Sequence, residues 1–247
     1  MTAGMRDGPQ RTTRRAVSRR EARFAGKSAA ALALLLAACT SIGGHDPRAR
    51  SAVDFGPPDA VSLCLYLDVG VSEEQARALV EEAWSEEAPL YGLRVKVTGV
   101  TRWPRPAFTM DGILEALSRE PLRPGCDRVL ALLGRHLGDF IWGLLPLPEA
   151  LGAVDDDTLT HGYAVITRVT INQLFLSPRD VVRHELYHML GSPEHFDMGG
   201  CYRQIAALKR WKRAHASEFF PAWDSVKREM LVSREAVNAR LKSSGPQ

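Results

Sequence analysis

The stretch that most constrains this chain is residues 184–188, which read His-Glu-Leu-Tyr-His. In a helix, residues four apart lie on one face, so His184 and His188 can bind the same metal ion. Glu185 can then reach a water molecule on that ion and act as its general base. The stretch therefore predicts a helix that packs on a core with one face and presents a metal site on another.

Flanking residues predict where this helix begins and which face it buries. Ser177 is a typical N-cap, Pro178 suits the first helical position, and Asp180 places an acid in the first turn. An apolar stripe at i, i+4, i+7 and i+8 is expected to face the core; its members are Val182, Leu186, Met189 and Leu190. The two histidines lie off this stripe, so they are free to face a cleft.

Two histidines leave a catalytic zinc ion short of ligands, because such an ion usually has three protein ligands and one water. Gly191 stands where helices commonly end, and Ser192-Pro193 then favours extended chain that carries His195 back across the site. We therefore predict His195 as the third ligand and a cofactor of one Zn²⁺ per chain. Glu194 is the main alternative; weaker alternatives are Glu218, Asp224 and Cys201.

Residues 184–195 resemble the active-site motif of the metzincin metallopeptidases, in which two helical histidines, a glycine and a third histidine follow in order. The resemblance implies hydrolysis of peptide bonds, with Glu185 as the catalytic base. In the family the third ligand comes three residues after the glycine; here that position is Glu194, and His195 follows it. No oxyanion donor can be assigned; Tyr187 and Tyr202 are the nearest candidates.

Residues after the motif bear on which branch of the metzincins the chain resembles. These peptidases carry a methionine in a tight turn beneath the metal, for which Met198 is the nearest candidate, although it stands unusually close to the third ligand. In the archaemetzincin branch a cysteine lies six residues beyond the third histidine, as Cys201 does here. Two other positions of that branch differ, since they hold Phe196 and Arg203, and the subfamily stays open.

A second function fits the same residues. The displaced third ligand suggests a non-catalytic surface lipoprotein with a structural or degenerate metal site that binds a partner. Glu185 argues against it, because a structural zinc site needs no general base. The leading prediction is a peptidase whose partner is a peptide or protein substrate.

The N-terminus predicts export and a lipid anchor. Residues 1–38 carry eight basic residues against two acidic ones and end in ten apolar residues, Ala29–Ala38, too few to span a bilayer. Leu36-Ala37-Ala38-Cys39 resembles a bacterial lipobox, which implies cleavage before Cys39 and lipidation of that cysteine. We expect an extracytoplasmic, membrane-anchored lipoprotein; the export route and the membrane that holds the anchor stay open.

Removing the signal peptide reverses the net charge. The chain has 32 basic and 29 acidic residues, of which eight and two lie before Cys39, so 24 basic and 27 acidic residues remain. The mature chain therefore has a net charge of −3 and no basic excess of the kind that binds nucleic acids. We expect no nucleic-acid partner.

The rest of the chain is expected to form one domain after a flexible tether at residues 39–59, which is rich in Ser, Gly, Pro and Arg. The domain, residues 60–247, would divide into subdomains at 60–191 and 192–247. Three cysteines, Cys64, Cys126 and Cys201, allow at most one internal disulfide, and the sequence does not say which.

Strand and helix patterns alternate in the first subdomain. Strands are predicted over 61–69, 93–100, 128–133 and about 163–169, and helices over 73–87 and 110–118. This order predicts an α/β fold, a mainly parallel twisted sheet with crossover helices and the motif helix after it. By the metzincin resemblance, residues 152–169 would include the strand lining the cleft, whose edge can pair with an extended peptide. His161 in this stretch is predicted to be structural or cleft-lining.

The second subdomain is predicted to be small and helical, because apolar residues recur at helical spacing beyond Cys201. It contains a basic cluster, residues 209–213, predicted to be a solvated helix face with Trp211 turned inward. The alternative is contact with anionic lipid headgroups beside the anchor.

Overall fold

The computed structural model describes residues 44–136, 150–167 and 176–244. The predicted signal peptide, Cys39 and the first residues of the predicted tether lie outside the described residues. None of the described helices is long and apolar enough to cross a membrane.

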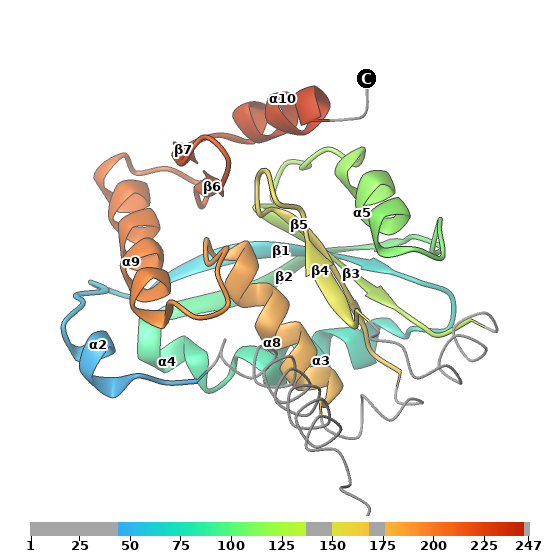
Figure 1. Ribbon diagram of the computed structural model, residues 1–247, viewed down its shortest axis with the longest axis horizontal. Coiled ribbons are helices and arrows are strands. Elements are labelled where there is room, and N and C mark those ends of the chain that lie inside the picture. Colours follow the sequence, from blue (N-terminus) through green and yellow to red (C-terminus); the bar gives the residue numbers. More distant parts are fainter. Residues whose placement is uncertain (1–43, 137–149, 168–175, 245–247) are drawn as a thin grey trace, which may run out of the picture. The chain divides into compact units, whose positions relative to one another are not determined.

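Five strands form one sheet in the order β2-β1-β3-β5-β4 (Figure 1). Four of them run parallel: β1 (Asp59–Leu67), β2 (Leu93–Arg102), β3 (Arg128–Leu133) and β5 (His161–Val165). The short strand β4 (Gly152–Val154) pairs antiparallel with β5 at one edge. Along the chain, helices connect β1 to β2 and β2 to β3, because parallel strands need such crossover connections. The predicted α/β class with a mainly parallel sheet is confirmed.

Helices pack on both faces of this sheet, because alternate residues of β1 and β3 point to opposite sides and are buried on both. One hydrophobic core joins the first face to α3 (Glu73–Trp84), α4 (Glu87–Tyr91) and α8 (Pro178–Met189). A second core joins the other face to α5 (Met110–Ser118) and the C-terminal α10 (Arg234–Ser244). The helix that carries the His-Glu-x-x-His stretch is α8.

The first predicted helix is shorter than expected. It ends at Trp84, and a separate helix, α4, contains Pro89 in its first turn. Proline lacks an N–H, which is tolerated there because the first turn has no intrahelical acceptors for its donors. α4 ends at Tyr91, and its C-cap residue Gly92 has a left-handed conformation, with a φ of 54°.

Residues 44–59, predicted as part of a flexible tether, are folded onto the domain. They include α2 (Pro47–Ser51), which Asp46 caps with its side chain, and the backbone N–H of Asp46 donates to the Tyr202 hydroxyl at 3.0 Å. Phe55 packs edge-on against Tyr91 and Tyr202. The prediction was wrong here because one aromatic residue and a capped turn suffice to dock a segment of polar composition.

The C-terminal region is only partly helical. The predicted helix beyond Cys201 forms as part of α9 (Met198–Ala214), which begins earlier, at Met198. Residues 222–231, however, form a hairpin of β6 (Ala222–Asp224) and β7 (Glu229–Leu231) before α10. The helical spacing of apolar residues misled the prediction because Asp224 accepts the backbone N–H groups of Val226 and Lys227. That side chain therefore closes a turn where a helix would have continued.

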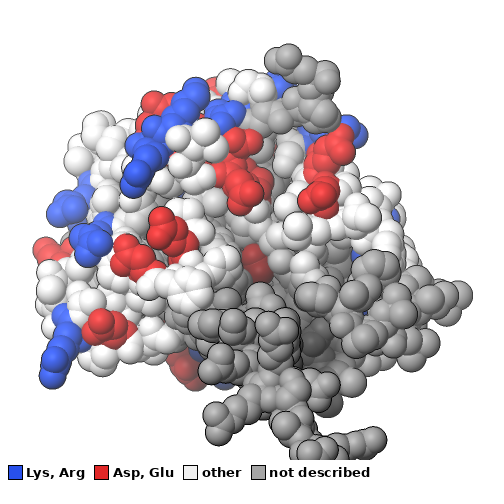
Figure 2. All heavy atoms as spheres, in the orientation of Figure 1, with Lys and Arg blue, Asp and Glu red and all other residues white. Residues whose placement is uncertain are grey.

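The basic cluster 209–213 is largely used inside the fold. Lys209 is fully buried and donates to the carbonyls of Tyr91 and Gly92, at 2.6 and 2.8 Å. Lys212 pairs with Asp59 at 2.8 Å. Trp211 is partly exposed and stacks on His215, so the residue turned inward is Lys209 and not Trp211. Figure 2 shows acidic and basic side chains interspersed on the face that it presents.

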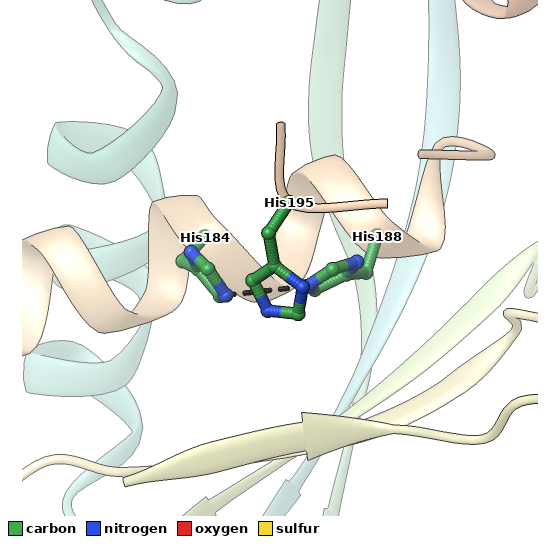
Figure 3. A group of neighbouring side chains, drawn as sticks. All are labelled: His184, His188 and His195. Carbon is green, nitrogen blue, oxygen red and sulfur yellow. Dashed lines mark hydrogen bonds between the residues drawn. The ribbon is translucent and has the colours of Figure 1, made fainter. Parts of the chain in front are cut away.

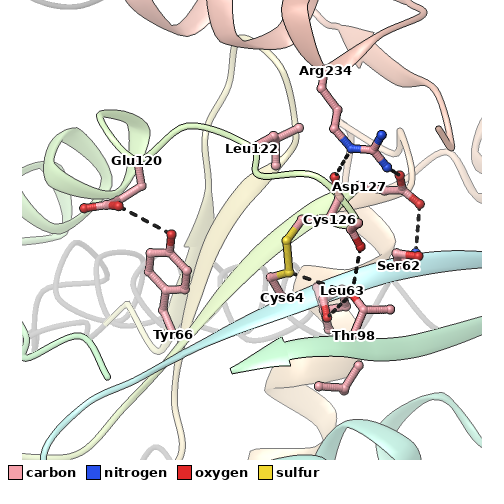
Figure 4. Close-up of a disulfide and its surroundings, with 12 residues drawn as sticks. Ser62, Leu63, Cys64, Tyr66, Thr98, Glu120, Leu122, Cys126, Asp127 and Arg234 are labelled. Carbon is pink, nitrogen blue, oxygen red and sulfur yellow. Dashed lines mark hydrogen bonds and ion pairs between the residues drawn. A yellow bond between two sulfur atoms is a disulfide. The ribbon is translucent and has the colours of Figure 1, made fainter. Parts of the chain in front are cut away.

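A disulfide joins Cys64 and Cys126, whose Cα atoms lie 5.6 Å apart (Figure 4). It ties β1 to the loop before β3, and Cys201 is a free, buried thiol. Beside it, Asp127 accepts from the backbone of Ser62 and from Arg234. The disulfide and this carboxylate together fix the start of β3 against the neighbouring strand and the C-terminal segment.

Arg128, the first residue of β3, is 2% exposed and connects three parts of the fold. Its guanidinium donates to the carbonyls of Met189, at the end of α8, and of Phe220 and Pro221, with distances of 2.6, 3.1 and 2.6 Å. Burial lowers the pKa of Arg128 to about 10, so it stays charged at neutral pH. A buried cation persists only where such acceptors surround it.

Replacing this guanidinium tests that role. Arg128→Met should lower the free energy of unfolding by about 3–5 kcal/mol, because the buried carbonyls lose their donors. Arg119→Met, which removes an arginine with a side chain 70% exposed in a surface ion pair with Glu115, should cost less than about 1 kcal/mol. Urea unfolding of both variants measures the difference, and equal midpoints would contradict the assigned role.

Candidate metal centre

The motif helix begins where the sequence predicts. The Ser177 hydroxyl accepts from the backbone of Asp180, and the Asp180 side chain accepts from the backbone of Ser177, which forms a capping box with Pro178 in the first turn. The predicted apolar stripe is buried; its members are 0–2% exposed (Val182, Leu186, Met189 and Leu190). Gly191 has a φ of 96°, the left-handed conformation expected at the end of the helix.

Three histidines converge beside this helix (Figure 3). The Nε2 atoms of His184 and His188 lie 3.1 Å apart, and His195, from the loop after α8, brings its ring to them. One ligand atom from each histidine lies within 4.8 Å of the others. A tetrahedral zinc ion with bonds of ~2.0–2.1 Å holds two imidazole nitrogens about 3.3 Å apart. The His184–His188 spacing therefore matches that of two ligands of one ion, and the three histidines together could hold a metal ion.

The protonation of the two helical histidines suits a metal. His188 Nδ1 lies 2.6 Å from the carbonyl of Ser192. When Nδ1 carries the ring proton and donates it to this carbonyl, Nε2 keeps a free lone pair. Burial lowers the pKa of His188 to about 4. Burial, with the neighbouring His188 and His195, lowers the pKa of His184 to about 3. Both rings are then neutral at physiological pH, the form that binds metal ions.

Glu185 is 4% exposed, and its Oε2 has no hydrogen-bond partner among the described residues. Burial raises the pKa of Glu185 to about 8. A buried carboxylate oxygen without a partner is costly, and it is a usual feature of sites that act on a ligand. Three imidazoles and the carboxyl of the residue after His184 fit a zinc ion and its water, and the positive charge of the ion would favour the ionised carboxylate.

The other candidate ligands lie outside this group. Among the described residues, Glu194 and Glu218 are exposed and belong to no such cluster. Asp224 is buried but pairs with Arg240 at 2.6 Å. Burial raises the pKa of Cys201 to about 12, and its sulfur accepts a hydrogen bond from the Ser192 hydroxyl. Cys201 therefore supports the loop that holds His188.

Three further expectations are corrected by the structure. Met198 was the candidate for the methionine of a tight turn. It is the first residue of α9 and packs on the core, so it lies in the first turn of a helix instead. Tyr187 is fully buried behind α8, where its hydroxyl donates to Glu87 at 2.6 Å, and Tyr202 is likewise buried. Neither tyrosine can reach an oxyanion at the histidines.

His161 is fully buried and hydrogen-bonded to Thr160, which confirms the structural interpretation of this residue.

Two supports of the site escaped the sequence analysis. Tyr91 and Tyr187 share a hydrogen bond of 2.7 Å, which extends to Glu87 and anchors the back of α8 to α4. Gly152, in the edge strand β4, lies against the Glu185 side chain. The only sequence signal for the hydrogen bonds to α4 was its Glu-x-x-x-Tyr spacing. The only signal for the contact with Glu185 was the isolated glycine at position 152.

No family model matches this chain, and no curated protein is detectably similar to it.

The identity of the third ligand is directly testable. His195→Ala should raise the zinc dissociation constant by at least ~100-fold, because it removes a ring from the ligand set. Glu194→Ala, one residue earlier in the same exposed loop, is the matched control and should leave the constant nearly unchanged. Competition with a chromophoric chelator measures both, and the reverse order of effects would identify Glu194 as the ligand.

Proposed function

We propose that this chain is a zinc-dependent peptidase held at a membrane by a lipid on Cys39. The observation that carries the proposal is that three histidines converge at a helix in which the residue after His184 is a buried glutamate, whose Oε2 has no hydrogen-bond partner among the described residues. A structural metal site gains nothing from such a carboxyl, whereas hydrolysis requires a base at that position. Metzincin-like ancestry stays a prediction from residues 184–195.

The residues divide the chemistry between them. When bound, zinc supplies a water of lowered pKa and polarises the scissile carbonyl. His184, His188 and His195 would hold the ion. Glu185 accepts a proton from the attacking water and delivers it to the nitrogen of the leaving amine, so that the peptide bond breaks without a charged amide leaving group. Burial keeps bulk water from competing for the Glu185 carboxyl.

The edge strand supports a peptide as the substrate class. β4 is the last strand in the sheet order, and α8 packs against it. An extended peptide can add to such an edge through main-chain hydrogen bonds. A peptide bound there would run past Glu185, because Gly152 of β4 contacts that side chain.

The proposed location is extracytoplasmic. Cys39 follows a signal-like segment with a lipobox, and the disulfide between Cys64 and Cys126 supports an oxidising compartment. The folded segment after residue 43 leaves only a short stretch between the proposed lipid and the domain. We therefore expect the peptidase to act close to the membrane surface.

The alternative of a non-catalytic metal-binding lipoprotein drew its support from the late position of His195. The three rings converge in spite of that spacing, so this support is weakened. The two functions differ in turnover, which the next experiment measures.

Glu185→Gln should keep one zinc per chain and lose peptidase activity by about 10²–10⁴-fold, because the amide cannot accept the proton. Casein and a random peptide pool serve as substrates, with zinc measured by atomic absorption. Glu194→Gln, an exposed neighbour, should retain full activity. Zinc binding by the wild-type protein without turnover of any peptide would contradict the proposal and favour the partner-binding alternative.

Cys39→Ser tests the anchor. The wild-type protein expressed in bacteria should incorporate an alkyne-labelled fatty acid, and the variant should not, because the hydroxyl of serine is not acylated at a lipobox. Cys201→Ser is the control, since that thiol is buried and should not carry lipid. Label on the Cys39 variant, or none on the wild type, would refute lipidation at this residue.

A further inference from the structure

The edge strand β4 passes the Glu185 side chain at very short range. A Cβ atom built on Gly152 would lie 2.8 Å from Cδ and 2.9 Å from Cγ of Glu185, and closer still to Oε1. Carbon atoms in proteins pack at about 3.5–4.0 Å. The carboxyl of Glu185 therefore occupies the space that any other residue at position 152 would need.

Backbone conformation does not explain this glycine. Gly152 is not among the glycines with positive φ, and it lies in a regular antiparallel pair with Ala164 of β5. Glycine within a strand is unfavourable unless another group approaches the backbone closely. Here the approaching group is the side chain of Glu185.

Contact, and not hydrogen bonding, holds the Glu185 carboxyl in place. Its Oε2 has no hydrogen-bond partner among the described residues, and the side chain is 4% exposed. On the side of β4, the backbone at Gly152 is the surface on which the carboxyl rests. We infer that Gly152 is a positioning residue, which sets where the Glu185 carboxyl stands relative to His184, His188 and His195.

This inference rests on the proposed peptidase function and deepens it. A peptide that adds to β4 would take its position from the same strand, Gly152–Val154, whose first residue positions the base. One short strand, β4, would then fix the distance between the Glu185 carboxyl and the backbone of the bound peptide. A methyl group at position 152 would move the carboxyl by an amount on the order of 1 Å, enough to cost roughly 10²-fold in rate.

The test compares Gly152→Ala with the wild-type protein. The variant should bind one zinc per chain, because the three histidines are intact, and lose about 10–100-fold in kcat with little change in KM. Gly99→Ala is the matched control, since Gly99 lies in the opposite edge strand with a Cβ position 3.0 Å from the Cys64 sulfur. Wild-type kcat in Gly152→Ala, or an equal loss in Gly99→Ala, would overturn the inference.

A stability measurement tests the same contact without turnover. In the wild-type background Gly152→Ala should lower the Tm by about 2–6 °C, because the buried carboxyl is overpacked. In a Glu185→Ala background the same substitution should cost little, because the space is then empty. Equal Tm losses in both backgrounds would overturn the inference. Absence of peptidase activity in the wild-type protein would contradict the proposed function. The difference in Tm loss between the two backgrounds would still show whether Gly152 packs against Glu185.

Discussion

The position of the helix that carries His184 and His188 depends on one buried guanidinium. Arg128 begins the central strand β3 and donates to the last carbonyl of α8 and to the carbonyls of Phe220 and Pro221. Its desolvation is unfavourable by itself, so the acceptors must stay in place together. The end of α8 is thereby fixed to the sheet, and the loop that carries His195 starts from a defined point.

The rest of the site is built outward from that fixed helix. The buried Glu87 and Tyr91 of α4 hold the back of α8 through Tyr187, and the carbonyl of Ser192 orients His188. On the side of β4, Gly152 packs against the Glu185 side chain. For the proposed zinc site, the helix and the loop thus carry the candidate ligands, the loop also orients His188, and the edge strand would place the base.

Much of this could be predicted from local signals. The capping box at Ser177, the apolar stripe of α8 and the strand patterns depend on neighbours within a few residues. Their elements form, although the strand predicted at about 163–169 is found as β5 at His161–Val165. The docked segment at 44–59 and the inward turn of Lys209 depend on partners far along the chain. The hairpin at 222–231 depends on a local turn closed by Asp224, which the helical spacing of the apolar residues obscured. A strand of three residues such as β4 is too short to show a period. The contact of Gly152 with Glu185 therefore had no sequence signature beyond the glycine.

The central claim is that three histidines bind one zinc ion while Glu185 stays outside its coordination sphere. A crystal structure of the zinc-loaded protein, with anomalous diffraction at the zinc edge, tests this most directly. The account predicts one ion bonded to ring nitrogens of His184, His188 and His195 at about 2.0–2.1 Å, with the Glu185 carboxyl against Gly152 and within hydrogen-bonding reach of the zinc-bound water. An ion coordinated by Glu194 or by Glu185 itself, or bound elsewhere in the domain, would contradict it.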